Sequence, residues 1–220
     1  MESLKKIILG AGGQAKEVLG YYFDLGQEEQ VIGFAEENST RVGQLINGKP
    51  IYDVSYLNLL EVNNRPLLTP AIGSTKRARL IKILEDSHFQ FDTVVHPSAV
   101  ISKWSSINTG TVVAPGVVIT SNVIIGKYVL LNYCSSIGHD SIIGNFTTIS
   151  PGARISGHVN IGNQVFVGNN ASINEGITIG DGAVIASGSA VIEDVPSMAL
   201  VAGVPARVKK IYQSEAEKPW

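Results

Sequence analysis

The sequence lacks the features of disulfide-stabilised, membrane-spanning and nucleic-acid-binding proteins. Cys134 is the single cysteine of 220 residues, so an intrachain disulfide framework and a thiolate metal cluster are excluded. No run of about eighteen apolar residues is present, and the segment from Met1 to Gly10 is too short for a signal peptide. The net charge of −2 gives no electrostatic reason to expect nucleic acid as a partner. We therefore expect a cytoplasmic protein that binds neither membranes nor nucleic acids.

Charge is also scarce in one part of the chain. Charged residues make up 16% of the sequence, and few of them lie between residues 104 and 180, whereas most of the 23 glycines lie after residue 100. The hydrophobic content of 44% argues against disorder. This shift in composition predicts two folded units with a boundary near residue 93, namely 1–93 and 94–195, followed by a C-terminal segment over 196–220.

From residue 95 onward an aliphatic side chain recurs at every sixth position without a gap. A helix would give spacings of three and four, and an ordinary strand would alternate at two. A period of six instead indicates a solenoid in which each unit is a short strand and a turn, with the aliphatic side chain pointing to a common axis. The positions are Val95, Ile101, Ile107, Val113, Ile119, Ile125, Leu131, Ile137, Ile143, Ile149, Ile155, Ile161, Val167, Ile173, Ile179, Ile185 and Val191.

The residues around each aliphatic position fit this geometry. The position two before it is mostly Ala, Ser, Thr or Val, which suits a narrow interior. The position after it is often glycine, as at Gly126, Gly138 and Gly144, and we expect these glycines at corners where the backbone leaves the usual φ range. Three units would form a triangular coil of about eighteen residues, stacked at about 4.8 Å into roughly five to six coils.

The first ninety residues follow a different pattern. The expected elements are strands at Lys5–Leu9, Val31–Phe34 and Leu67–Ile72 and helices at Ala15–Phe23 and Thr75–Asp86. This order predicts a small Rossmann-like βαβαβ unit, in which the glycine-rich turn from Gly10 to Gln14 and the following helix N-terminus approach a phosphate. Glu36 and Glu37, after the second strand, are placed to accept hydrogen bonds from a ribose or a nucleobase. The same turn also fits a tight βα connection that binds nothing.

Both halves together resemble the bacterial nucleotide-amino-sugar N-acetyltransferases of the hexapeptide-repeat type. That family includes bacillosamine- and perosamine-pathway enzymes, which act on 4-amino-4,6-dideoxy sugars, and is related to the sialic-acid O-acetyltransferases. The resemblance runs from Lys6 to about Lys210. It is carried by Gly10-Ala11-Gly12-Gly13, Ala71-Ile72-Gly73, Val95-His96-Pro97-Ser98-Ala99, Leu131-Asn132, Gly138-His139-Asp140 and Gly203-Val204-Pro205-Ala206. It implies an α/β Rossmann-like domain before a left-handed parallel β-helix, and a homotrimer with active sites between neighbouring β-helices.

The resemblance also implies the reaction: acetyl transfer from acetyl-CoA, without a metal, to the 4-amino group of a UDP-, dTDP- or GDP-linked 4-amino-4,6-dideoxy sugar. Sugar O-acetylation of the sialic-acid type is the alternative. The residues implied for the nucleotide-linked sugar are Gly10, Gly12, Gly13, Gln14, Glu36, Glu37, Gly73, Ser74 and Asn132. Those implied for acetyl-CoA are Thr148, Gly157, Gly168, Ala186, Gly203, Pro205 and Arg207. Gln14 and Thr148 stand where the family often has histidines.

His139 is the candidate catalytic base, with Asp140 directly after it. An imidazole titrates near neutral pH, so it suits removal of a proton from an attacking amine, and a carboxylate can fix its tautomer. From spacing alone His139 fits a polar corner residue equally well, and the resemblance to the family's His–acid pair favours catalysis. By the same resemblance, the backbone N–H of Gly157 is the candidate donor to the oxyanion.

The remaining histidines and the cysteine are expected to have structural roles. We expect His88 and His158 to face solvent, His96 to support the start of the repeat, and Cys134 to be a small buried residue. A hydratase of the γ-carbonic-anhydrase type would need three histidines around zinc, but the central repeat holds only His139 and His158. A solenoid without catalysis is disfavoured by the His–Asp pair and the nucleotide-type N-terminal unit.

Overall fold

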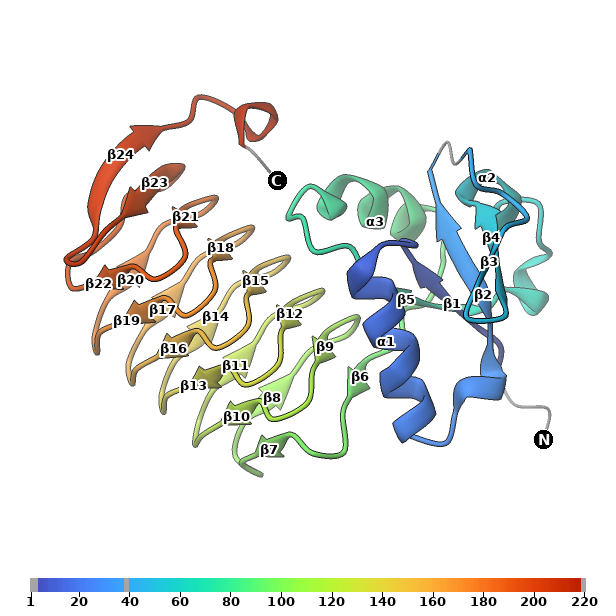
Figure 1. Cartoon of the computed structure of the whole chain (residues 1–220), viewed down its shortest axis with the longest axis horizontal. Coiled ribbons are helices and arrows are strands. Elements are labelled where there is room, and N and C mark those ends of the chain that lie inside the picture. The colour runs from blue at the N-terminus through green and yellow to red at the C-terminus, as the bar shows by residue number, and fades with distance from the viewer. Residues whose placement is uncertain (1–3, 38–39, 219–220) are drawn as a thin grey trace.

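The computed structural model of the chain describes residues 4–37 and 40–218. An α/β sheet precedes a rod of stacked coils, and the C-terminal segment returns from the far end of the rod toward the sheet (Figure 1). There it meets the start of helix α3 (Arg77–Asp86), where Nζ of Lys76, the residue before the helix, donates to the Lys218 carbonyl at 2.9 Å. Among the described residues no helix combines the length and the apolar character needed to cross a bilayer.

The N-terminal sheet has five strands in the order β3-β4-β2-β1-β5. All neighbours pair in parallel except β3 and β4, which form an antiparallel hairpin. The strands are β1 (Lys6–Leu9), β2 (Val31–Glu36), β3 (Leu45–Ile46), β4 (Lys49–Asp53) and β5 (Leu67–Pro70). The helices are α1 (Gly13–Asp24), α2 (Val54–Leu57) and α3 (Arg77–Asp86), with short 3₁₀ turns η1 (Glu28–Gln30) and η2 (Val62–Asn64). A third 3₁₀ turn, η3 (Glu215–Glu217), lies near the C-terminus.

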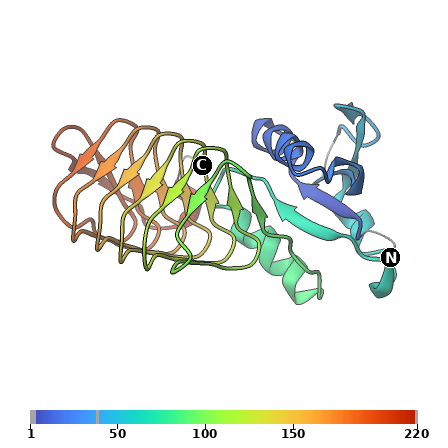
Figure 2. The same cartoon turned by 90° about the horizontal axis from the view of Figure 1, so that it is seen from below.

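Strand β1 lies between β2 and β5 in this sheet, and its alternate side chains enter two different cores. Ile8 packs with α1 and the start of the rod, whereas Ile7 and Leu9 pack with α3. The two helices accordingly lie on opposite faces of the sheet (Figure 2). A strand buried on both faces is continuously apolar, which explains why Ile7, Ile8 and Leu9 follow one another without polar alternation.

The hairpin of β3 and β4 is absent from the sequence-based expectation. Its two-residue loop is Asn47–Gly48, with φ values of +47° and +79°. Positive φ at both loop residues is the type I′ turn that Asn-Gly favours, because its twist matches that of the paired strands. The dipeptide was therefore an available signal for the extra strands.

The rod is a three-sided β-helix, and its faces are three sheets. Its strands have two residues each and pair in parallel, except that the last two strands of the chain are longer and antiparallel to each other. The six-stranded face contains β7 (Val100–Ile101), β10 (Val118–Ile119), β13 (Ser136–Ile137), β16 (Arg154–Ile155), β19 (Ser172–Ile173) and β22 (Ala190–Val191). The five-stranded face contains β8 (Ser106–Ile107), β11 (Ile124–Ile125), β14 (Ile142–Ile143), β17 (Asn160–Ile161) and β20 (Thr178–Ile179). The eight-stranded face contains β6 (Val94–Val95), β9 (Val112–Val113), β12 (Leu130–Leu131), β15 (Thr148–Ile149), β18 (Phe166–Val167), β21 (Val184–Ile185), β23 (Ala199–Ala202) and β24 (Arg207–Ile211).

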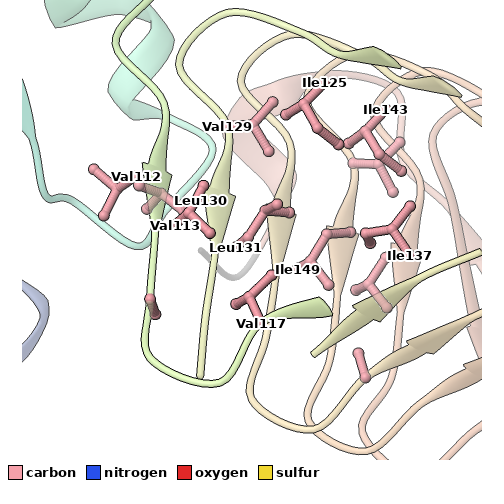
Figure 3. Packing of buried hydrophobic residues seen from close by; sticks show 14 of the residues in the cluster. Val112, Val113, Val117, Ile125, Val129, Leu130, Leu131, Ile137, Ile143 and Ile149 are labelled. Atoms are coloured by element: carbon pink, nitrogen blue, oxygen red, sulfur yellow. The ribbon is translucent and has the colours of Figure 1, made fainter. Parts of the chain in front are cut away.

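Each predicted aliphatic residue is the second residue of one of the strands β6 to β22. Strands pair with those one coil away, so that Ile119 lies beside Ile137 and Ile125 beside Ile143. The pairing confirms a coil of eighteen residues, made of three six-residue units. The aliphatic side chains fill the interior (Figure 3), and from Val113 onward they are at most 3% exposed.

The glycines after the aliphatic residues have a different role from the one expected. Positive φ occurs instead at the third residue after the aliphatic one, as at Asp140 (+57°) and His158 (+55°). Gly144 lies where neighbouring coils approach closely, because a Cβ there would lie 2.4 Å from the carbonyl carbon and oxygen of Gly162. These glycines are needed for space between coils, and the φ prediction for them was wrong.

Replacing Gly144 with alanine tests this close approach. We expect the variant to lose about 1–3 kcal/mol of stability, because the backbone of the next coil has to move to admit the methyl group. Gly20→Ala is the matched control, since a Cβ there meets nothing within 4 Å and alanine favours the helix. Urea unfolding at one protein concentration compares the two, and equal unfolding midpoints would contradict the steric explanation.

Candidate active site

His139 and Asp140 lie at the corner between β13 and β14, where the six-stranded face meets the five-stranded face. The Nδ1 atom of His139 lies 2.9 Å from Oδ2 of Asp140. An ionised carboxylate only accepts hydrogen bonds, so Nδ1 carries the proton. In the neutral ring Nε2 is then the free basic nitrogen. A general base needs this Nδ1-protonated tautomer.

Asp140 is held in its ionised form from two sides. Nδ2 of Asn122, one coil below, donates to its Oδ1 at 3.0 Å, and His139 donates to its Oδ2. These two hydrogen bonds, that from Asn122 first, hold the pKa of the Asp140 carboxyl below its usual range. Asp140 therefore stays negatively charged at neutral pH and orients the imidazole.

Gly157 lies directly against the His139 ring, one coil further on. A Cβ at Gly157 would lie 2.6 Å from Cε1 and 2.7 Å from Nε2 of the imidazole, so only glycine leaves room for the ring. Within the described part of the chain its backbone N–H has no hydrogen-bond acceptor. An unused N–H beside a basic nitrogen is a suitable donor to an oxyanion.

A cavity of about 560 Å³ lies at the carboxyl edge of the N-terminal sheet. Its lining includes predicted substrate residues from the glycine turn, from the end of β2 and from the loop after β5: Gly10, Gly12, Gly13, Gln14, Glu36, Glu37 and Gly73. Arg41 also lines it, and its side chain pairs with Glu36 and donates to the Ala11 carbonyl at 3.3 Å. The carboxyl edge of a parallel sheet is the usual ligand-binding edge.

A second cavity, of about 280 Å³, lies between α1 and the β-helix. Its lining includes Gly13, Gln14 and Gly73, which also line the first cavity, so the two spaces adjoin. It adds Ser74, Asn132 and Thr148 among the predicted residues, together with the overlooked Glu17, Tyr133, Ser150 and Phe166. Burial raises the pKa of Glu17.

The predicted residues fall on two different corners of one β-helix. Asn132 follows β12 and borders the second cavity at the corner of the eight-stranded and six-stranded faces, whereas His139 is one corner further along the same coil. His139 borders neither of the two cavities. A single chain thus presents the candidate sugar site and the candidate base on separate corners.

Three predicted acetyl-CoA residues have distinct environments. Gly168 and Ala186 occupy the same coil position as Asn132, two and three coils further on, and a Cβ on Gly168 would lie 2.9 Å from the carbonyl carbon of Ala186. Thr148 is only 2% exposed. Its hydroxyl accepts from Arg77 at 2.8 Å and donates to the Gly73 carbonyl at 3.0 Å. This bonding favours a structural role for Thr148 over the direct acetyl-CoA contact we expected.

The C-terminal predicted residues lie at the far end of the rod. Gly203 and Pro205 belong to the exposed turn between β23 and β24, and Arg207 begins β24. The turn is tied to the last coil, since the Ala206 N–H donates to the Ala190 carbonyl at 2.7 Å. The Arg207 guanidinium lies 3.6 Å from Glu193 and is half exposed.

One of the expected environments was wrong. Cys134 is exposed rather than buried, because it occupies the outward-pointing third position at its corner with φ of +57°. His158 is exposed, as expected, and its Nε2 also lies 4.0 Å from Oδ2 of Asp140. Counting eighteen residues from Asp140 would have found His158 beside it.

His139, Asp140 and His158 are also close enough together for their ligand atoms to lie within 4.8 Å of one another. The hydrogen bond from Nδ1 of His139 to Oδ2 of Asp140 already engages one of these carboxylate oxygens. With two imidazoles rather than three, this set differs from that of the zinc hydratase considered above.

Comparison with known proteins agrees with this architecture. The family described as bacterial transferase hexapeptide (six repeats) matches residues 158–193, and no curated protein matches the chain in sequence. The chain is similar to a histidine-to-alanine variant of GDP-perosamine N-acetyl transferase from Caulobacter crescentus, solved with CoA and GDP-perosamine: 30% identity, a TM-score of 0.87, and coverage of 94% of this chain and 99% of that one.

Two further solved structures are similar over the same share of the chain. The acetyltransferase domain of PglB from Neisseria gonorrhoeae, in complex with acetyl coenzyme A, has 26% identity and a TM-score of 0.84. WeeI from Acinetobacter baumannii has 28% identity and a TM-score of 0.84. Each match covers 94% of this chain and 100% of the other.

The three-sided β-helix with a His–Asp pair at its corner is the scaffold of an acyltransferase. The chain belongs to the family of bacterial hexapeptide-repeat acetyltransferases that includes perosamine N-acetyltransferase.

Proposed function

We propose that the protein transfers the acetyl group of acetyl-CoA to the 4-amino group of a nucleotide-linked 4-amino-4,6-dideoxy sugar. The observation that carries this proposal is the His139–Asp140 pair, whose free Nε2 lies beside the unused N–H of Gly157. The named ligands of the Caulobacter enzyme, CoA and GDP-perosamine, and of the Neisseria domain, acetyl coenzyme A, support the substrate classes.

The reaction follows from these groups. The sugar amine attacks the thioester carbonyl carbon while Nε2 of His139 accepts one of its protons. The carbonyl oxygen becomes an oxyanion, to which the Gly157 N–H donates. The C–S bond then breaks, the amide carbonyl reforms, and the CoA thiolate takes the proton from the imidazolium of His139. Asp140 stabilises that imidazolium throughout.

The two adjoining cavities suit a nucleotide and its sugar. In this proposal residues 1–93 form a Rossmann-like domain whose first cavity takes the nucleotide, with its ribose or base near Glu36 and Glu37. The sugar extends into the second cavity toward Asn132. Residues 94–195 form a left-handed β-helix, and the 196–220 segment lies beside acetyl-CoA, which runs past Gly168 and Ala186.

The separation of Asn132 and His139 on two corners calls for a second copy of the chain. Apolar side chains point outward on the two faces that flank the His139 corner: Val100 and Val118 on the six-stranded face, and Ile124 and Ile142 on the five-stranded face, at 38–63% exposure. Such a patch marks an interaction surface. We propose a homotrimer in which the Asn132 corner of one copy meets the His139 corner of the next, and sedimentation as a monomer would contradict it.

An acceptor screen tests the function. The purified protein is incubated with acetyl-CoA and UDP-, dTDP- or GDP-linked 4-amino-4,6-dideoxy sugars, with the matching 4-hydroxy sugars in parallel, and products are identified by mass spectrometry. We expect acetylation of the amino sugars with one nucleotide preferred. Turnover of hydroxyl acceptors alone would replace this proposal with the sialic-acid type of O-acetylation.

Asp140→Asn removes the negative charge of residue 140 while keeping nearly the same side-chain shape. Because the pKa of Asp140 lies below its usual range, the wild-type carboxylate is ionised throughout the assay range and favours the imidazolium form of His139. Removing its charge favours the neutral ring, so the acidic limb of the pH–rate profile should move to lower pH. We expect kcat to fall by about tenfold to a hundredfold. An acidic limb that stays in place would mean that Asp140 does not act through His139.

A further inference from the structure

Equivalent positions on successive coils form a column of side chains at the His139 corner. Asn122, Asp140 and His158 are each third after a buried isoleucine, and all three have positive φ, at +60°, +57° and +55°. Asparagine, aspartate and histidine tolerate this region better than most residues. Asp140 therefore lies between an amide on one neighbouring coil and an imidazole on the other.

His158 contacts both members of the catalytic pair. Its ring meets the His139 ring edge to face, with centroids 5.0 Å apart and planes at 88°. Its Nε2 lies 4.0 Å from the same Oδ2 of Asp140 that accepts from His139. Its backbone N–H donates to the His139 carbonyl at 2.8 Å, which fixes the His158 backbone relative to that of His139.

We propose that His158 is a positioning residue for the proposed acetyl transfer: its ring confines the imidazole of His139 and shares the Asp140 carboxylate with it. Asn122 occupies the other oxygen of Asp140, so the two imidazoles have one oxygen between them. The imidazole of His139 contacts the His158 ring on one side and Gly157 on another. His139 therefore keeps one orientation, in which Nε2 is free to receive the proton of the amine.

The charge state of His158 also affects His139 electrostatically. The charged groups that face His158 are Asp140 and, when protonated, His139. Glu175 lies one coil above Gly157, and Arg154, whose guanidinium donates to the Cys134 carbonyl at 2.6 Å, starts the preceding strand. A proton held on the His158–Asp140 side opposes a second proton on His139, because two like charges about 5 Å apart repel even in water. Loss of the His158 ring should therefore change the pH dependence of the proposed reaction as well as its rate.

His158→Gly tests the proposal without backbone strain, because Gly152 and Gly176 hold the equivalent coil position with φ of +70° and +75°. We expect kcat to fall about tenfold through looser positioning. The KM values for both substrates should stay unchanged. The acidic limb of the pH–rate profile should move up by about half a pH unit, opposite to the shift expected for Asp140→Asn.

Gln164→Gly is the matched control, since Gln164 has the same coil position and φ of +54° at a different corner. A lower kcat in His158→Gly with an unmoved acidic limb, or equal effects in both variants, would reduce His158 to a structural residue and overturn the proposal.

The proposal depends on the proposed function only for its kinetic readout, and histidine titration followed by NMR supplies another. With ¹³C-labelled histidine and no substrate, the His139 resonance should titrate at higher pH in His158→Gly than in wild type. That shift supports the pairing even where no acetyl transfer is detected. An unchanged titration in a protein that acetylates sugars overturns the pairing alone.

Discussion

Replacing His139 with alanine is expected to lower kcat by about 10²–10⁴, the usual contribution of a general base, while acetyl-CoA still binds. The reason is that Nε2 of His139 is the free basic nitrogen at this corner, with its tautomer fixed by Asp140. Removing the ring leaves Gly157 with its N–H in place and more space, so the coil has no reason to unfold. Steady-state kinetics at saturating acetyl-CoA and isothermal titration with CoA measure the two effects separately.

His88→Asn is the matched control for His139→Ala. His88 is an exposed histidine with φ of +63° at the end of α3, and asparagine tolerates that backbone. Its kinetics should match wild type. If His139→Ala keeps activity within about tenfold of wild type, the loss is too small for a general base, and the amine must lose its proton to another group. A variant that no longer binds CoA would instead place His139 in binding.

The β-helix could be predicted from the sequence because its repeat is short and its register is set by one buried residue per strand. Each aliphatic side chain from Val95 to Val191 ends a two-residue strand, so the period alone gives the number of coils and the residues inside. The same arithmetic places Gly157 against His139. Applied to Asp140, it also places Asn122 and His158, which shows that the column of side chains at the His139 corner could be predicted from the sequence.

The function of the corner glycines was harder to deduce. Glycine serves both positive φ and close approach, and the repeat does not say which applies at a given position. At Gly138 a Cβ would lie 2.4 Å from the carbonyl carbon of Ser156, so the need there is for space. The residues that do adopt positive φ include Cys134 and Asp140, neither of which suggests a turn by its chemistry alone.

The packing of the N-terminal unit on the rod could not be read from periodicity. Tyr128 stacks on Phe146 one coil later and meets Phe91 edge to face, and its hydroxyl donates to Glu85 on α3. In the repeat, Tyr128 and Phe146 occupy the outward-pointing third position after the aliphatic residue. The repeat alone predicts a solvent-exposed corner there. Contacts between units depend on where the first unit lies, and nothing in the six-residue period encodes that placement.

Arg77 is the residue at this junction whose loss should cost the most stability. It begins α3, is only 2% exposed, and carries no carboxylate partner among the described residues. Its guanidinium donates instead to backbone carbonyls of both units and to the Thr148 hydroxyl. The carbonyl acceptors are those of Ile72, Ser74, Tyr128, Phe146 and Thr147, at 2.9–3.4 Å.

Arg77→Met is therefore expected to lower the free energy of unfolding by about 3–5 kcal/mol. Methionine fills part of the space but donates nothing, so several buried carbonyls lose their partners, at about 1–3 kcal/mol for each group left unsatisfied. Burial lowers the pKa of Arg77 to about 9, which still leaves it charged at neutral pH, and the surrounding carbonyl dipoles replace the water that a buried cation has lost.

Arg79→Met is the matched control, two residues further along α3. Its side chain is 68% exposed and pairs with Glu37, and exposed pairs contribute about 0–1 kcal/mol. Denaturant unfolding should separate the two variants clearly, and equal losses would mean that the Arg77 bonds are replaceable by water. Arg77 also ties Ser74 and Thr148 beside the second cavity. In Arg77→Met that remains folded, the KM for the nucleotide sugar should therefore rise more than the KM for acetyl-CoA.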